Sequence, residues 1–209
     1  MNVPILLVAT DSIKWKGVDG IISDFSVAGA YEAMRPRAHV VSWFHVIWFS
    51  QCIPRHPFVA WLLMMEKLKT HDKMMAWEIH NQTLLCPLCK GCSDSHSHLF
   101  FECNFSRAVW DKARPYMNIQ IHSYNWSHIS NCLADGAVNS ARVVVSKLMF
   151  AAMVYFLRQE RNCRLFKGKS RTKDRLFDDI YSSVRLKLMT IHFKESRQVR
   201  ELKIVWRLA

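Results

Sequence analysis

Four side chains in the middle of the chain have the residue types and the spacing of a metal site. Cys86 and Cys89 form a Cys-x-x-Cys pair, His98 follows after eight residues, and Cys103 follows after four more. A Cys-x-x-Cys pair on a tight turn places two thiolates within reach of one ion, and a His and a Cys five positions apart can complete a tetrahedron. Because four such donors leave no open coordination position, the pattern predicts a structural zinc ion rather than a catalytic one.

Neighbouring residues leave the identity of two ligands open. Cys92 forms a second Cys-x-x-Cys pair with Cys89, and His96 lies two positions before His98. The three cysteines from Cys86 onward also have a spacing seen in iron–sulfur proteins, although a fourth thiolate would normally follow sooner and precede a proline. The simplest alternative is that these cysteines and histidines do not bind a common metal ion. The additional histidine and the last cysteine favour the zinc site.

The cysteine content and the first residues indicate an intracellular protein. Seven cysteines is an odd number, and a local cluster of them favours metal binding over disulfides. The first ten residues contain an apolar run with no basic residue ahead of it, which makes a poor secretory signal. The longest apolar stretch, residues 143–157, is shorter than the roughly 20 residues that span a bilayer. We therefore expect a protein of the nucleus or cytoplasm with no membrane partner.

Apolar spacing, helix caps and helix breakers predict the elements that must position the four donors. In chain order they are a hairpin within residues 13–27, a helix from Ser26 to Pro36, helices at 57–68, from 70 or 72, and at 105–114, and two long helices at 141–166 and 172–192. Pro115 is expected to end the fourth of these helices and Gly168 the fifth. The predicted fold class is mainly α, a small zinc-stapled helical domain with a short N-terminal β-hairpin and a C-terminal helical hairpin.

Changes in composition divide the chain into four segments. They are a lead-in segment with a small hairpin and helix at 1–40, a zinc-binding domain at 41–117, a polar linker at 118–138, and a basic helical hairpin and tail at 139–209. We find no internal repeat and no low-complexity tract.

Short strings in a fixed order surround the four donors. They include Asp24-Phe-Ser-Val27, Trp43 with Trp48, Ile53-Pro54, Cys86-Pro-Leu-Cys89, His98-Leu-Phe-Phe-Glu-Cys103 and Gln159-Glu160-Arg161-Asn162. Over roughly residues 11–167 this combination resembles the reverse transcriptase zinc-binding domain of plant LINE-type (non-LTR) retroelements and of host proteins derived from it. The resemblance implies zinc bound by Cys86, Cys89, His98 and Cys103, and an origin in the region that follows a polymerase domain.

The sequence does not predict an enzyme. A polymerase needs carboxylates from separate strands to hold two divalent ions. Asp178 and Asp179 are adjacent, but they fall inside a helical pattern and lack an acidic partner, so we interpret them as a solvated helix face. Glu160 is expected to pair with Arg164, one helical turn further on. We expect no cofactor except zinc and no small-molecule substrate.

The distribution of charge favours an acidic partner. Lys and Arg outnumber Asp and Glu by 29 to 17, and residues 151–209 contribute +9 of the net charge of +12. This balance favours RNA or DNA, bound without sequence preference through phosphates. The candidate contacts are Arg158, Arg161, Arg164, Lys167, Lys169, Arg171, Lys173 and Arg175. The alternative is a structural or protein-interaction remnant with an unidentified protein partner, in which these side chains are merely solvated.

Overall fold

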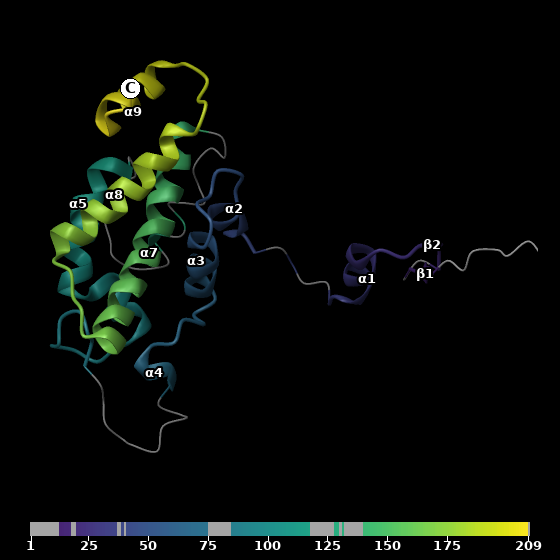
Figure 1. Ribbon diagram of the computed structural model, residues 1–209, viewed down its shortest axis with the longest axis horizontal. Helices are drawn as coiled ribbons and strands as arrows, with labels where there is room; N and C mark the ends of the chain where they lie inside the picture. Colours follow the sequence, from purple (N-terminus) through teal and green to yellow (C-terminus); the bar gives the residue numbers. More distant parts are fainter. Residues whose placement is uncertain are drawn as a thin grey trace, which may run out of the picture. The chain divides into compact units, whose positions relative to one another are not determined.

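The computed structural model describes residues 13–17, 20–36, 39, 41–74, 85–117, 128–129, 131 and 140–208 (Figure 1). The contacts divide the chain into two units, Met1–Val40 and Val41–Ala209. The predicted linker at 118–138 lies outside the described residues apart from His128, Ile129 and Asn131.

The first unit contains the predicted hairpin and helix. β1, Lys14–Lys16, pairs antiparallel with β2, Ile22–Asp24. α1, Val27–Met34, begins where the Ser26 hydroxyl accepts a hydrogen bond from the backbone N–H of Gly29 at 3.0 Å. A serine in this position satisfies one of the N–H groups that the first turn of a helix leaves unpaired. The hairpin and the capped helix are therefore confirmed.

The second unit consists mainly of helices in its described part. They are α2 Phe44–Ile47, α3 His56–Met64, α4 His71–Met74, the short π-helix η1 His98–Glu102, α5 Asn104–Met117, α7 Ala141–Lys167, α8 Lys173–Met189 and α9 Arg197–Trp206. The prediction of a mainly α fold is confirmed.

α7 is the helix against which the others pack. It contacts α3, α5, α8 and α9, and Figure 1 shows it between α3 and α8. Most side chains between Val145 and Arg161 are buried. The apolar stretch at 143–157 is thus covered by neighbouring helices, as expected of a helix that is apolar on most of its faces. Among the described helices, none combines the length and the hydrophobicity needed to cross a membrane.

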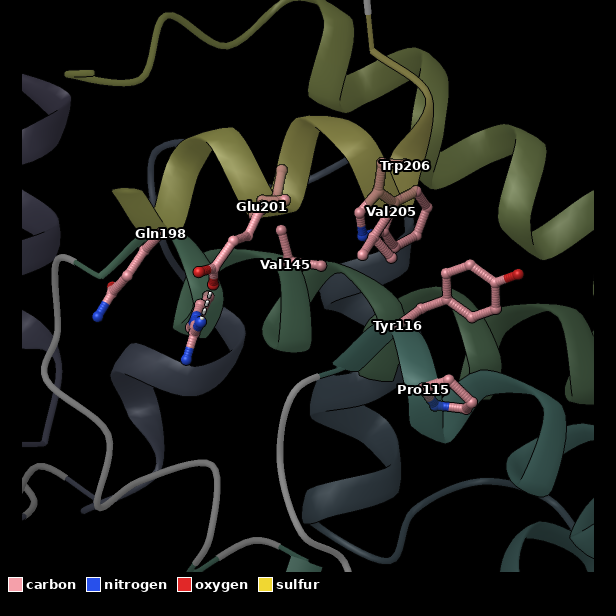
Figure 2. Close-up of a pocket in the computed structure, with 9 residues that line it drawn as sticks. Pro115, Tyr116, Val145, Gln198, Glu201, Val205 and Trp206 are labelled. Carbon is pink, nitrogen blue, oxygen red and sulfur yellow. Dashed lines mark hydrogen bonds and ion pairs between the residues drawn. The ribbon is translucent and has the colours of Figure 1, made fainter. Parts of the chain in front are cut away.

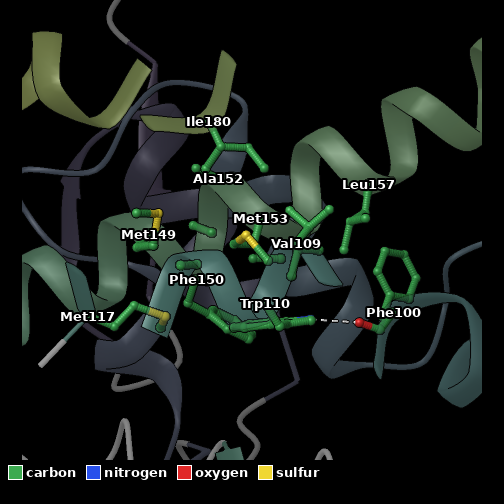
Figure 3. Close-up of a cluster of buried hydrophobic side chains, with 14 of the residues drawn as sticks. Phe100, Val109, Trp110, Met117, Met149, Phe150, Ala152, Met153, Leu157 and Ile180 are labelled. Atoms are coloured by element: carbon green, nitrogen blue, oxygen red, sulfur yellow. Dashed lines mark hydrogen bonds between the residues drawn. The ribbon is translucent and has the colours of Figure 1, made fainter. Parts of the chain in front are cut away.

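One core joins the two predicted ranges 41–117 and 139–209. Figure 3 shows its centre, where the ring of Trp110 on α5 lies 6.2 Å from that of Phe150 on α7, measured between centroids. Trp110 Nε1 donates a hydrogen bond to the carbonyl of Phe100 at 2.8 Å, so the polar atom of this buried ring is satisfied. The buried residues of both ranges form a continuous cluster.

The helix expected to end before Pro115 continues past it, because α5 is Asn104–Met117. The prediction was wrong at this end. Proline lacks an N–H and removes one helical hydrogen bond, but tertiary packing offsets that loss here. Met117 is fully buried, and Tyr116 lies edge-on to Trp206 with ring centroids 5.4 Å apart.

A short turn at residues 168–172 joins the two long helices. Gly168 ends α7 with φ at 61°, a left-handed conformation that glycine adopts without a steric penalty. Thr172 begins α8, since its hydroxyl accepts a hydrogen bond from the N–H of Arg175 at 3.2 Å. Both signals are local in sequence, and the predicted C-terminal helical hairpin is confirmed.

α9 occupies part of the segment that we expected to be a tail. Its Trp206 ring stacks on Tyr181 of α8 with centroids 4.9 Å apart and an angle of 4° between the planes. Arg185 donates to the carbonyl of Trp206 at 3.1 Å and to that of Arg207 at 2.8 Å, which satisfies the end of the helix. A small pocket of about 140 Å³ lies among α5, α7 and α9 (Figure 2), and the ion-paired Arg142 and Glu201 are among the residues that line it.

His56, at the start of α3, is an ionisable side chain buried in the core. It is 5 % exposed and its ring stacks on Tyr155 of α7 with centroids 4.4 Å apart. Its Nδ1 has no hydrogen-bond partner in the described part of the chain. Burial lowers the pKa of His56 to about 4, because the charged imidazolium would lose its hydration.

This burial predicts a specific dependence of stability on pH. The unfolded chain binds a proton at His56 near the ordinary histidine pKa of about 6.5, whereas the folded chain resists it down to about pH 4. Stability is therefore lost as pH falls between these values. Urea unfolding at pH 7 and pH 5 should show that His56→Phe reduces this acid-induced loss by about 2 kcal/mol. Equal losses in the two proteins would contradict the assignment.

Candidate metal centre

The Cys-x-x-Cys turn is closed by backbone hydrogen bonds. The N–H of Cys86 donates to the carbonyl of Cys92 at 2.7 Å, and the N–H of Lys90 donates to the carbonyl of Cys86 at 2.8 Å. Lys90 has φ at 56°, a left-handed conformation that reverses the chain just after Cys89. The sulfur of Cys86 also accepts hydrogen bonds from the N–H groups of Leu88 and Cys89. The turn thus presents its two sulfurs toward one point.

A π-helical turn supplies the other two donors. In η1, the N–H of Cys103 donates to the carbonyl of His98 at 2.7 Å, five residues back. An α-helix would rotate two residues five apart by about 140° relative to each other, whereas a turn closed by an i to i+5 hydrogen bond brings them together. Phe100 and Phe101 inside the turn are buried in the core, which fixes its position.

The four predicted donors converge in the folded chain. One donor atom from each of Cys86, Cys89, His98 and Cys103 lies within 4.8 Å of all the others. Cys86 Sγ is 4.0 Å from Cys103 Sγ, and Cys89 Sγ is 3.2 Å from His98 Nε2. Two sulfurs bound to one tetrahedral zinc at about 2.3 Å lie roughly 3.8 Å apart, so the spacing fits a metal ion.

The electrostatics of the cluster also favour a cation. The pKa of Cys103 is lowered to about 5, first because the Cys86 thiol donates a hydrogen bond to its sulfur, with help from the N–H groups of Ser106 and Phe105 at the start of α5. The same contact and burial raise the pKa of Cys86. A bound cation would offset the repulsion that otherwise opposes ionisation of both.

The two alternative donors lie outside the cluster. Cys92 is exposed. His96 is buried, but its Nε2 lies 3.1 Å from the carbonyl of Leu63, and burial lowers its pKa. Within the described residues, Cys86, Cys89, His98 and Cys103 form the one group of three or more Cys, His, Asp or Glu side chains close enough to share a metal ion.

Comparison with known proteins agrees with this geometry. Residues 25–110 match the family model described as zinc-binding in reverse transcriptase. This segment is thus similar to the zinc-binding domains of reverse transcriptases. The resemblance noted in the sequence is thereby confirmed. The chain is also 28% identical to a putative ribonuclease H protein of Arabidopsis thaliana over an alignment of 116 residues. This alignment covers 51% of this chain and 17% of that protein. The chain thus spans about a sixth of that relative, and no solved structure matches.

A buried ion pair ties the loop of the zinc-binding domain to α7. Arg161 Nε donates to Asp94 Oδ2 at 3.1 Å, and the two side chains are 5% and 2% exposed. Asp94 also accepts a hydrogen bond from the N–H of His71 at 3.0 Å. One carboxylate therefore connects α4, α7 and the loop of residues 85–97, which we call the metal loop.

Arg164 fastens the Cys-x-x-Cys turn itself. Its Nη1 donates to the carbonyl of Leu88 at 2.9 Å and to that of Pro87 at 3.3 Å, both between the two cysteines. Its guanidinium lies 4.5 Å from the ring centroid of Phe105. The predicted pairing with Glu160 is confirmed, with Arg164 Nε 2.7 Å from Oε1.

Glu160 is a charged side chain without solvent contact. Arg171 donates to its Oε2 at 2.8 Å, opposite the contact from Arg164. Burial alone would raise the pKa of Glu160, but the hydrogen bonds from Arg171 and Arg164 outweigh that effect and lower it. These contacts give the Gln-Glu-Arg-Asn string a structural role that goes beyond the predicted pairing of Glu160 with Arg164.

The eight basic side chains proposed for nucleic-acid contact fall into two groups. Arg161, Arg164 and Arg171 are engaged in the internal contacts described above, and Arg158 is half-buried. Those fully at the surface are Lys167, Lys169, Lys173 and Arg175. Of the two adjacent aspartates, Asp179 pairs with Arg171 at 2.9 Å and with Arg175 at 3.4 Å.

The Asp94–Arg161 pair predicts a large effect on stability. Arg161→Met leaves a buried carboxylate without its counter-charge and should lower the free energy of unfolding by about 3 kcal/mol or more. Arg197→Met, which breaks the exposed pair with Glu201 on α9, should cost less than about 1 kcal/mol. Urea denaturation of both variants with zinc present measures the difference. Similar small losses would show that the buried pair contributes little.

Proposed function

We propose that this chain is a non-catalytic zinc-binding module that contacts RNA or DNA through phosphates without reading the base sequence. The convergence of three sulfurs and one imidazole within 4.8 Å carries the metal part of the proposal. Thiolate and imidazole donors suit zinc, and four protein ligands leave no position for substrate or water. Zinc binding of this kind contributes roughly 10–16 kcal/mol near neutral pH, comparable with the whole stability of a domain.

The chemical type of the converging donors supports a module without catalytic activity. Two-metal nucleic-acid enzymes require clustered carboxylates. The group that converges here consists of three cysteines and one histidine instead. Because the thiolates must stay reduced to bind zinc, we place the protein in the nucleus or cytoplasm.

The exposed positive charge at the α7–α8 turn supports the nucleic-acid part. Lys167, Lys169 and Lys173 are exposed and form no ion pair with a described carboxylate, so their charge is available to a phosphate. The description of the matched family names reverse transcriptase, and the name of the relative contains ribonuclease H. Both are activities on nucleic acid. A retroelement origin of the module is consistent with both.

A second candidate is a structural or protein-interaction remnant of such an element. The observation that favours it is the internal use of Arg161, Arg164 and Arg171, since three of the eight basic residues stabilise the fold and cannot also bind phosphate. Under this alternative the remaining lysines are solvated, and zinc serves folding alone.

Metal analysis tests the zinc site. Purified protein should contain one zinc ion per chain, and Cys86→Ser and His98→Ala should weaken zinc binding by more than about a hundredfold, since even loss of an outer-shell partner can cost that much. Cys92→Ser is the matched control and should retain zinc. Elemental analysis and chelator competition measure both effects. Metal-free protein that remains folded would refute the site, and loss of zinc in Cys92→Ser would reassign a ligand.

Salt titration distinguishes the two candidate functions. The affinity of the protein for a single-stranded oligonucleotide should fall as salt rises, with a slope set by the number of phosphate contacts. Changing Lys167, Lys169, Lys173 and Arg175 to Gln should flatten that slope by up to about 3 if each makes one contact. The same change at Lys194, Arg197, Arg200 and Lys203, around α9, is the control. Identical behaviour of the two variants and the parent would favour the remnant.

A further inference from the structure

A groove of about 430 Å³ lies between the Cys-x-x-Cys turn and the α7–α8 turn. The metal loop provides one wall with Leu85, Pro87 and Lys90, and the end of α7 with the following turn provides the other with Leu165, Lys169 and Ser170. Segments that are far apart in sequence thus face each other across a shared opening. This volume is in the range of small-molecule sites, about 300–1,000 Å³.

The walls of the groove are tied together by one side chain. The Arg164 guanidinium donates to the carbonyl of Leu88 on one wall and, through Nη2, to the carbonyl of Arg171 beside the other, each at 2.9 Å. Glu160 lies beneath it, fully buried and paired. A groove whose width is set by such contacts is formed before a ligand arrives, which reduces the entropic cost of binding.

The lining of the groove is positively charged. Lys90 and Lys169 are exposed on opposite walls, and neither forms an ion pair with a carboxylate of the described residues. No aspartate or glutamate is among the described residues that line it. Leu85 and Leu165 add exposed apolar surface beside the two ammonium groups. Cations next to apolar surface suit a chain of phosphates that carries sugars and bases.

We infer that this groove receives the sugar–phosphate backbone of a single strand of RNA or DNA, with Lys90 and Lys169 contacting phosphates from either side. The inference rests on the proposed function and gives it a location. Charged grooves that follow the backbone are the usual means of binding single strands without sequence preference.

The site also makes strand binding depend on the metal loop. One wall is the turn that carries Cys86 and Cys89, and Lys90 directly follows the second of these cysteines. Without zinc, the conformation of that turn would no longer be held by metal coordination. The strand would be affected even though none of its atoms needs to contact the ion. We therefore expect zinc and a single strand to bind with positive cooperativity.

Two kinds of variant test the groove. Lys90→Gln with Lys169→Gln removes two phosphate contacts and should weaken binding of a twelve-nucleotide oligo(dT) roughly tenfold at 0.15 M salt, with a slope shallower by about 1.4. Ser170→Trp fills the groove without changing the net charge and should weaken binding as much. The matched controls are Lys194→Gln with Arg200→Gln, near the opposite end of α7, and Ser182→Trp on the exposed side of α8. Fluorescence anisotropy measures affinity, and zinc content is measured on each sample.

The outcomes separate the groove from the general proposal. Selective loss in the groove variants, with normal zinc content and normal binding by the controls, supports the inference. If all variants bind like their controls while the parent shows salt-dependent binding, the groove is refuted and the proposed function stands. A parent that shows no salt-dependent binding refutes both.

Discussion

Two buried carboxylates, Asp94 and Glu160, determine how the metal loop joins the helical core. A carboxylate without solvent contact is costly unless cations and hydrogen bonds surround it. Here each has arginine partners, and these arginines come from α7 and the turn after it. The loop can therefore occupy one position against α7, because any shift would leave a buried charge unpaired. The donor geometry of the metal centre depends on that fixed position.

The parts of the fold that could be predicted are those whose causes are local. Ser26 and Thr172 cap the helices that follow them, and Gly168 ends the helix before it, because each acts on N–H groups or dihedral angles within a few residues. The convergence of Cys86, Cys89, His98 and Cys103 has a similar origin, since their spacing is typical of a tetrahedral set, although spacing alone left Cys92 and His96 as alternatives.

What could not be predicted depends on contacts between distant segments. Arg161 contacts Asp94 across 67 positions of sequence, and Arg164 contacts the carbonyl of Leu88 across 76. Patterns of helix length, which span roughly 10–20 residues, cannot include both partners of such a contact. The continuation of α5 past Pro115 follows from packing that periodicity does not report. α9 is different, because Val199, Leu202 and Trp206 have helical spacing and all three are buried. That signal was present in the sequence.

The matched segment ends at residue 110, but its support continues beyond that point. Arg161, Arg164 and Arg171 lie 50 or more residues further along the chain and contact the metal loop or the carboxylate beneath it. The zinc-binding domain and the C-terminal helices consequently share one core and one network of buried charge. The physical unit is larger than the segment that matches the family model.

The π-helical turn has a consequence for how the sequence can vary during evolution. A single inserted or deleted residue between His98 and Cys103 would rotate one donor away from the other and would also move Phe100 and Phe101 out of the core. In the segment between Cys89 and His98, residues 90–93 are exposed, whereas Asp94 and His96 are buried. Homologous chains should therefore tolerate length changes within residues 90–93 more readily than in the four-residue interval between His98 and Cys103.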